Sequence, residues 1–409
     1  MASLVASSSP TRVAIIGAGI GGLTLARILQ LRKSPSLTFT VYESDTDAAI
    51  RATLGGSLDL KYESGQRAMR DAGLHADFLK LSRPVGDHMR ILDKTGKVFH
   101  ETTGGGADFY NPEIDRGQLR SLILDSLEPG TVQWGHKATA VHQDAATGTY
   151  TISFASGAKA EDANIVVGAD GAWSCVRPLV WPGAAPVYSG ATFLETKISM
   201  ATHPEFAPLV GRGAMIALGD GKALMAQQNA NDVMVLYAAV RVPEDWARTS
   251  RVAQAQAPEK TTVMLEEHFA DWDAPLRDLV RVGASPTLRP IYALPYDAEP
   301  RSKTENVVLL GDAAHLMSPF AGEGVNLAMA DAADLAKALV SGKPHALETY
   351  EKQMRERANK SGQESATNLE LFLGEDAADK VATLFKGHEM SWGVAYMVKS
   401  YYYIRSLFS

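Results

Sequence analysis

The residues best suited to binding chemistry lie in one turn rich in glycine and proline, residues 311–326. An apolar run, 307–310, precedes this turn, and a helical pattern of apolar residues follows it. The pattern predicts a buried strand, a long turn and a helix start. Such a turn brings the carboxylate of Asp312 close to backbone N–H groups and to the positive end of a helix dipole. These groups suit a large ligand that is partly anionic.

A second turn, residues 17–22, has the spacing Gly-x-Gly-x-x-Gly between a predicted strand and a predicted helix. In dinucleotide-binding folds, Gly17 permits the tight turn, Gly19 lets a pyrophosphate approach the backbone, and Gly22 lets helix and strand pack closely. A further predicted strand ends at Glu43, whose carboxylate can accept hydrogen bonds from ribose hydroxyls. An acid at this place favours FAD or NAD over NADP.

A third apolar strand ends in Gly168-Ala169-Asp170-Gly171, as the strand before the first turn ends in Gly311 and Asp312. Ligands of open parallel sheets bind beyond the carboxyl ends of the strands. We therefore predict that all three turns contact one dinucleotide.

Other charged residues leave alternatives open. Asp115 is suited to be the N-cap of a helix, which puts Arg116 in the first turn, where the dipole disfavours a cation by roughly 0.3–1 kcal/mol. Arg116 is then either solvated or, as we favour, in contact with an anionic ligand, with Arg120 as a second contact. A Gly-rich segment ending near Asp59 is either a strand-edge bulge or part of a ligand site.

The composition is that of an ordinary globular protein, with 409 residues, 45% hydrophobic and 21% charged. The net charge of −7 and the lack of a basic tract argue against nucleic-acid binding. One cysteine, Cys175, and ten scattered histidines make a disulfide or a metal site unexpected. No apolar run approaches the ~20 residues that span a bilayer, and no secretion signal is evident. We expect a cytoplasmic monomer without nucleic-acid or membrane partners.

The pattern changes near residue 181, after which strands and helices occur without a Gly-rich phosphate loop until about residue 296. This predicts an α/β protein in which a β-sheet domain for the substrate is inserted into a Rossmann-like nucleotide-binding domain. The predicted parts are 1–75, 100–180 and 297–345 for the nucleotide domain, 76–99 and 181–296 for the substrate domain, and 346–409 for C-terminal helices. A hairpin is expected within 132–154, a flexible loop at 104–106, and an aromatic segment at 401–405 that docks on either domain.

Three motifs occur in order along the chain. They are Gly17-x-Gly19-x-x-Gly22, then Gly168-Ala169-Asp170-Gly171-x-x-Ser174-x-x-Arg177, then Gly311-Asp312-Ala313-Ala314-His315 followed by Pro319, Gly322, Gly324 and Asn326. In this order and spacing the chain resembles the class A FAD-dependent aromatic hydroxylases (para-hydroxybenzoate-hydroxylase-like) over nearly its whole length. Segments 58–66, 111–116 and 315–322 also resemble those of the tetracycline-inactivating flavin monooxygenases.

The resemblance implies an FAD-binding domain and a role for each matching residue. Glu43 would hold the adenosine ribose, Asp312 would bind the ribityl chain, and Asp59 and Arg116 would lie near the flavin. The Asp170 turn would shape the cleft used by FAD and NAD(P)H. The ring would be lined by Pro319, Phe320 and Gly322. The predicted cofactor-binding residues are Gly17, Gly19, Gly22, Glu43, Asp59, Arg116, Arg120, Asp170, Gly311, Asp312, Pro319, Gly322, Gly324, Val325 and Asn326.

The predicted substrate contacts depart from those of the tetracycline enzymes, which carry an arginine and a histidine on their substrate-facing sheet. The matching stretches here offer Ala223 and Val235, and Glu195 lies near the place of a glutamine. Phe320 and Gly322 complete the predicted contacts.

These features lead to a hypothesis of flavin monooxygenation. NADPH or NADH would bind transiently and reduce FAD, and a C4a-hydroperoxyflavin would pass one oxygen atom to a polycyclic or phenolic substrate. The best single candidate is a tetracycline-like compound, as in antibiotic resistance, and no side chain is expected to act as a strong base. One alternative is a biosynthetic hydroxylase, epoxidase or Baeyer–Villiger enzyme acting on a polyketide or alkaloid. A remoter alternative, an NAD-dependent dehydrogenase, leaves the Asp170 and Asp312 motifs unexplained.

Overall fold

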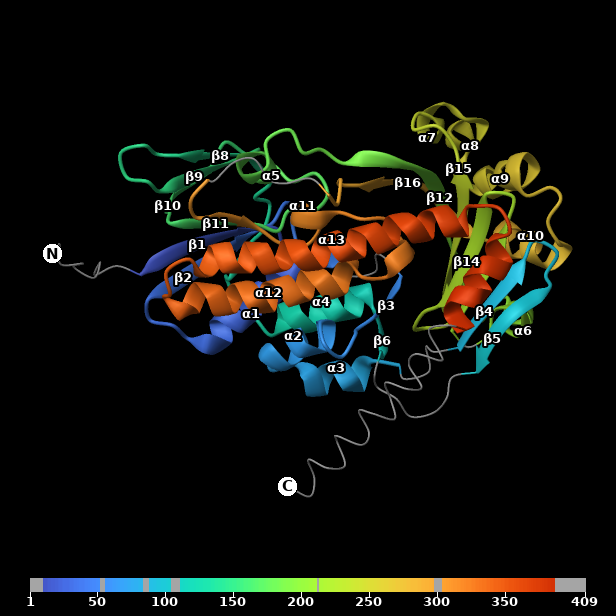
Figure 1. Ribbon diagram of the computed structural model, residues 1–409, viewed down its shortest axis with the longest axis horizontal. Coiled ribbons are helices and arrows are strands. Elements are labelled where there is room, and N and C mark those ends of the chain that lie inside the picture. The colour runs from blue at the N-terminus through green and yellow to red at the C-terminus, as the bar shows by residue number, and fades with distance from the viewer. Residues whose placement is uncertain are drawn as a thin grey trace, which may run out of the picture. The chain divides into compact units, whose positions relative to one another are not determined.

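Figure 1 shows a computed structural model of the chain, which describes residues 10–51, 56–83, 88–103, 111–211, 213–297 and 304–386. The predicted loop at 104–106 and the aromatic segment at 401–405 lie outside the described residues. The chain divides into two compact units. The first comprises Met1–Pro84, Ala107–Ser189 and Tyr292–Thr367, and the second comprises Val85–Gly106, Gly190–Ile291 and Asn368–Ser409.

The first unit is built on a five-stranded parallel sheet of order β17-β11-β1-β2-β7. Ile16 of β1 is level with Gly168 of β11, and Gly168 is level with Leu309 of β17. The three strands therefore end together, as the sequence predicts for a ligand-binding edge. The strands are β1 (Thr11–Ile16), β2 (Leu37–Tyr42), β7 (Val132–Gln133), β11 (Ile165–Gly168) and β17 (Val307–Leu309).

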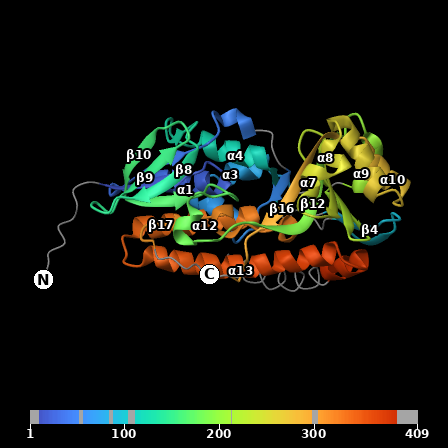
Figure 2. The same ribbon diagram turned by 90° about the horizontal axis from the view of Figure 1, so that it is seen from above.

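Helices cover one face of this sheet. Val13 and Ile15 of β1 share one buried core with α1, α2, α4 and α12. The helices α12 and α13 run side by side in both views (Figure 1, Figure 2). The helices with a part in this unit are α1 (Ile20–Arg32), α2 (Gly65–Asp71), α3 (His75–Leu81), α4 (Arg116–Asp125), α5 (Arg177–Val180), α11 (Asp312–His315), α12 (Gly324–Ser341) and α13 (Ala346–Phe372), with the short turns η1 (Ala48–Arg51) and η4 (Pro319–Ala321).

A three-stranded antiparallel sheet covers the other face, where Ala14 and Ile16 pack against Ile152 and its neighbours. Its strands are β8 (Ala138–Gln143), β9 (Tyr150–Phe154) and β10 (Lys159–Ala163). The predicted hairpin within 132–154 is therefore right for β8 and β9 only. Residues 132–133 instead join the parallel sheet beside β2. The sequence could not show this, because a strand of two residues is recognised only by the strand it pairs with. A two-stranded sheet pairs β3 (Ser57–Asp59) with β6 (Glu113–Asp115).

The second unit contains a seven-stranded sheet of order β16-β12-β15-β14-β13-β4-β5. Alternate residues such as Leu236 and Ala238 share a buried core with the helices α8, α9 and α10, while Tyr237 lies on the opposite face. The elements are β4 (His88–Asp93), β5 (Val98–Thr103), β12 (Val187–Ser199), β13 (Ala214–Gly219), β14 (Lys222–Gln228), β15 (Val233–Arg241), β16 (Ala284–Ala293), α6 (Ala207–Val210), α7 (Trp246–Thr249), α8 (Arg251–Gln254), α9 (Lys260–His268) and α10 (Ala274–Arg281), with η2 (Pro204–Phe206) and η3 (Ala257–Glu259).

The mixed α/β architecture agrees with the predicted fold class. None of the helices in the described ranges combines the length and the apolar character that a membrane span requires.

Candidate cofactor site

The turn between β1 and α1 has the shape of a phosphate-binding loop. Gly17 has φ +110°, and a Cβ there would lie 2.3 Å from the carbonyl oxygen of Ala169. A Cβ on Gly22 would lie 2.1 Å from the oxygen of Gly17. A Cβ on Gly19 would meet no atom of the described residues within 4 Å. Gly17 and Gly22 are thus required by the turn itself, whereas Gly19 leaves open space at the N-terminus of α1.

Two predicted residues hold this turn from opposite sides. Glu43 is 3% exposed, and its Oε2 accepts a hydrogen bond from the backbone N–H of Ala18 at 2.6 Å. Its Oε1 accepts from the hydroxyl of Ser44 at 2.7 Å. Arg120 is 5% exposed and donates from Nε to the carbonyl of Ala18 at 3.3 Å. The structure therefore places a buried carboxylate and a buried guanidinium at the glycine turn.

Arg177 links the turn at Asp170 to the turn at Asp312. This buried residue of α5 donates from Nε to the carbonyl of Ala313 at 3.0 Å, and from Nη2 to the carbonyl of Ala172. Burial lowers the pKa of its guanidinium, while the charges of Asp170 and Asp312 act in the opposite direction. One buried cation therefore serves both strand-end turns.

Asp170 lies in the turn that follows β11. Its Oδ2 accepts from the N–H of Cys175 at 2.8 Å. Its Oδ1 is buried, and no hydrogen-bond partner for it occurs among the described residues. Such an atom is suited to accept a hydrogen bond from a ligand hydroxyl.

The turn that follows β17, residues 311–326, leaves its predicted ligand-facing residues accessible. Asp312 is exposed at the start of α11, the single helical turn Asp312–His315. Pro319 is also exposed, and Gly322 follows it with φ +65° and open space where a Cβ would project. Phe320 between them is half-buried. The exposed Pro319 and Gly322 leave room for a flat group beside this turn.

The start of α12 is tied to the segment around Asp59. Gly324 and Val325 open this helix, and both are partly exposed. Asn326 is fully buried, donates from Nδ2 to the carbonyl of Asp59 at 2.9 Å, and accepts from the N–H of Lys61 at 2.9 Å. The structure therefore joins predicted site residues that are far apart in the sequence.

Arg116 stands at the first position of α4, as predicted, with its side chain exposed. Asp115 occupies the N-cap position but makes no side-chain cap hydrogen bond. Its carboxylate instead accepts from Nη2 of Arg83 at 2.7 Å. Asp115 is therefore the N-cap residue, as expected, but its side chain does not cap the helix, because a nearby guanidinium binds the carboxylate more strongly than a backbone N–H does.

Together these residues fit a dinucleotide. The open space at Gly19, the buried carboxylate of Glu43, the unsatisfied Oδ1 of Asp170 and the exposed carboxylate of Asp312 belong to turns that leave one edge of one sheet. A separate cavity of about 930 Å³, lined by residues of β17, α12 and α13, includes none of the four and is not the candidate site.

Three of the five predicted substrate residues, Glu195, Ala223 and Val235, lie on the second unit's sheet, on the face away from its helices. The other two, Phe320 and Gly322, belong to the first unit's turn after α11. Ala223 and Val235 are 0% and 1% exposed, so neither side chain is accessible in this structure. Glu195 is partly accessible, and its Oε2 lies 3.1 Å from Nε of Arg289. Tyr237 stands directly across from Glu195.

Two residues of this face were missed by the sequence predictions, Arg289 and Tyr237. Strand alternation could have found Tyr237, which stands two positions from Val235. Arg289 belongs to β16, and the sequence gives no sign that this strand lies beside β12.

The comparisons with known proteins decide the family. The family model described as FAD binding domain matches residues 10–365. This chain belongs to that family. The FAD-binding chain is 31% identical to "Monooxygenase asqM" of Emericella nidulans, over 92% of this chain and 98% of the relative.

Solved structures agree with the fold. A variant of Klebsiella pneumoniae HpxO complexed with FAD matches with a TM-score of 0.75 at 22% identity, over 94% of this chain and 97% of the other. Tetracycline destructase Tet(51) matches with a TM-score of 0.67 at 18% identity, over 92% and 97%. At such identities the likeness shows the fold alone.

The family and its monooxygenase relative confirm the class A resemblance. The chain is an FAD-dependent monooxygenase of the aromatic-hydroxylase type, and the dehydrogenase alternative is set aside.

Proposed function

We propose that this monooxygenase consumes NADPH or NADH and transfers one oxygen atom of O₂ to a polycyclic or phenolic substrate. Bound FAD supplies the redox chemistry and the activation of O₂. The observation that carries the proposal is the set of three glycine-bearing turns, two of them with an aspartate, at one edge of the parallel sheet.

The residues of these turns divide the work of holding FAD. Glu43 is assigned to the adenosine ribose, the backbone at Gly19 to the pyrophosphate, and Asp312 to the ribityl chain. Asp170 supplies a buried acceptor to the same cleft. The N-terminus of α12, at Gly324, favours negative charge on the nearby ring by about 1 kcal/mol. No side chain of the site is needed as a strong base.

The face of the second unit's sheet that lies away from its helices supports a substrate that is aromatic and carries a hydrogen-bond donor. Glu195, Tyr237 and Met225 stand in one row across three adjacent strands. The Tyr237 ring lies 5.9 Å from that of Phe193, measured between centroids. A carboxylate beside aromatic and thioether groups complements a flat ring system with a hydroxyl or N–H group.

A tetracycline-like compound is the first candidate because of the sequence resemblance alone, and a polyketide or alkaloid of a biosynthetic route is the second. The second candidate is favoured by the 31% identity to the fungal monooxygenase, against 18% to the tetracycline destructase. Ala223 and Val235, in place of the basic residues of the tetracycline enzymes, favour it too.

The test is a screen for substrate-stimulated NADPH and NADH oxidation by the FAD-loaded enzyme. The panel holds tetracyclines, simple phenols, polyketide phenols and aromatic alkaloids, with mass analysis for the gain of one oxygen atom. Oxygenated tetracycline alone supports the first candidate, and an oxygenated polyketide or alkaloid supports the second. The absence of reduction by either nucleotide, with every compound, contradicts the proposal.

A matched pair of variants tests the role of Glu195. Glu195→Gln removes a charged acceptor, so we expect kcat/KM for the substrate to fall about tenfold or more while FAD affinity stays unchanged. Glu101→Gln is the control. Glu101 belongs to the same sheet but stands outside the Glu195 row, and its Oε1 pairs with Nη2 of Arg90 at 2.5 Å. Equal losses in both variants would contradict the assignment.

A further inference from the structure

We propose that Asp331 is a positioning residue for FAD, which holds both ends of α11 through one carboxylate and so fixes the direction of Asp312. His315 acts with it at the far end of α11. The proposal rests on the assignment of Asp312 to the cofactor.

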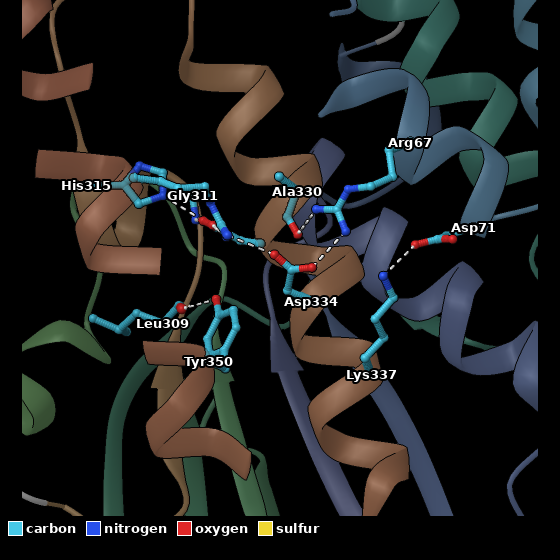
Figure 3. A network of polar contacts seen from close by, with 11 residues as sticks. Arg67, Asp71, Leu309, Gly311, His315, Ala330, Asp334, Lys337 and Tyr350 are labelled. Atoms are coloured by element: carbon cyan, nitrogen blue, oxygen red, sulfur yellow. Dashed lines mark hydrogen bonds and ion pairs between the residues drawn. The ribbon is translucent and has the colours of Figure 1, made fainter. Parts of the chain in front are cut away.

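The geometry is that of a clamp. Asp331 belongs to α12 and is fully buried. Its Oδ2 accepts a hydrogen bond from the N–H of Gly311 at 3.1 Å and lies 2.6 Å from Nε2 of His315. Gly311 precedes α11 and His315 ends it, so the two contacts enclose the turn. Figure 3 shows Gly311 and His315 side by side at one end of the polar network.

The turn needs this clamp because it is only four residues long. A single helical turn fixes several backbone dihedrals for few hydrogen bonds and is not stable alone. Its own bonds run from the N–H groups of Ala314 and His315 to the carbonyl of Gly311, at 2.8 and 2.9 Å. Gly311 has φ +58°, which glycine adopts without steric cost. The hold on the turn comes from Asp331, whose carboxylate contacts both of its ends.

The buried carboxylate is balanced by charges from other helices. Its Oδ1 accepts from Nη2 of Arg357 on α13 at 3.1 Å. Nη1 of Arg357 lies 2.9 Å from Asp334, which accepts from Arg67 at 2.7 Å. Figure 3 shows Asp334 and Arg67 on the side of the network away from His315. Removing the charge of Asp331 thus weakens the clamp, whereas removing that of Asp334 leaves it in place.

His315 adds a dependence on pH. Burial by itself lowers the pKa of His315, but the charge and hydrogen bond of Asp331 and the charge of Asp312 outweigh it, so the net shift is upward. The other charged groups around α11 are Arg357 and Arg177. Tyr350 keeps its proton, because burial raises its pKa well above the usual value. The ion pair with Asp331 is complete below the usual histidine pKa, about 6.5, and weakens as pH rises through the higher folded value.

The test compares Asp331→Asn with Asp334→Asn, two substitutions one helical turn apart in the same network. Each apoprotein is titrated with FAD by flavin fluorescence, and each is melted without FAD. We expect Asp331→Asn to raise the FAD dissociation constant about tenfold or more, since a charge-assisted contact is lost. Asp334→Asn is expected to change it less than about threefold at an equal or larger drop in Tm, because no Asp334 contact reaches α11.

Equal FAD affinity in wild type and Asp331→Asn overturns the proposal, as does an equal loss of affinity in Asp334→Asn. If Asp331→Asn does not fold, His315→Gln replaces it, because Gln keeps a donor without a charge. We then expect the wild-type FAD dissociation constant to rise as the pH passes through the raised pKa of His315, which lies above the usual value of about 6.5, and that of His315→Gln to stay flat over the same range. The same pH dependence in both proteins overturns the proposal. A wild-type protein that binds no FAD instead contradicts the assignment of the cofactor site.

Discussion

Two glycine-to-alanine substitutions in one turn should separate the needs of the fold from those of the cofactor. Gly19 has φ −70° and ψ 176°, which alanine adopts readily, and a Cβ there meets no atom within 4 Å. Gly19→Ala should therefore change the free energy of unfolding of the apoprotein by less than about 1 kcal/mol. A Cβ on Gly22 would lie 2.1 Å from the backbone oxygen of Gly17. Gly22→Ala should lower that free energy by about 1–3 kcal/mol.

FAD affinity should respond differently. The methyl group of Gly19→Ala projects into the open space assigned to the pyrophosphate, so at least one charge-assisted hydrogen bond is lost. Such a bond contributes about 1.5–3 kcal/mol, which raises the FAD dissociation constant about 10- to 150-fold. Urea unfolding of the apoprotein and fluorescence titration with FAD measure the two effects. A Gly19→Ala protein that binds FAD as tightly as wild type would refute the placement of the pyrophosphate.

Substitution of Arg177 and chemical modification of Cys175 test other parts of the site. Arg177→Leu removes the cation that bridges two strand-end turns, so it should lower the free energy of unfolding by about 2–5 kcal/mol. Arg177→Lys keeps the charge and should lower it less. Urea unfolding in which both variants are as stable as wild type would contradict this role. Burial and the nearby Asp170 raise the pKa of Cys175 to about 12, so iodoacetamide at pH 8 should modify it only after denaturation. Rapid modification of the native protein, followed by mass, would show that the thiol is not shielded.

The three strand-end turns could be predicted because each is encoded locally. An apolar run is followed at once by several glycines in the turn at Gly17, and by Gly and Asp in the other two. Their meeting at one edge also follows, since parallel strands end on the same side of a sheet. The pairing of Asp115 with Arg83 could not be predicted, because the two residues come together only when β3, β6 and the preceding segment are folded. The backbone position was right, and the side-chain partner was not.

The clamp on α11 was missed although the sequence holds a trace of it. Asp331 interrupts an otherwise apolar stretch that includes Met329, Ala330, Ala332 and Ala333, all buried in the structure. An acid in such a stretch indicates a buried partner. It does not say which one, because His315 and Arg357 reach it from other helices.

Oxygen tracing tests the central claim most directly, that the three turns hold FAD for a monooxygenase reaction. The purified enzyme with bound FAD is supplied with NADPH, isotopically labelled O₂ and a compound that the screen identifies as a substrate. The mass of the product is then measured by mass spectrometry. The account predicts one labelled oxygen atom in each product molecule and none when the label is in the water instead. Label that enters from water, or turnover that persists after FAD has been removed, would contradict it.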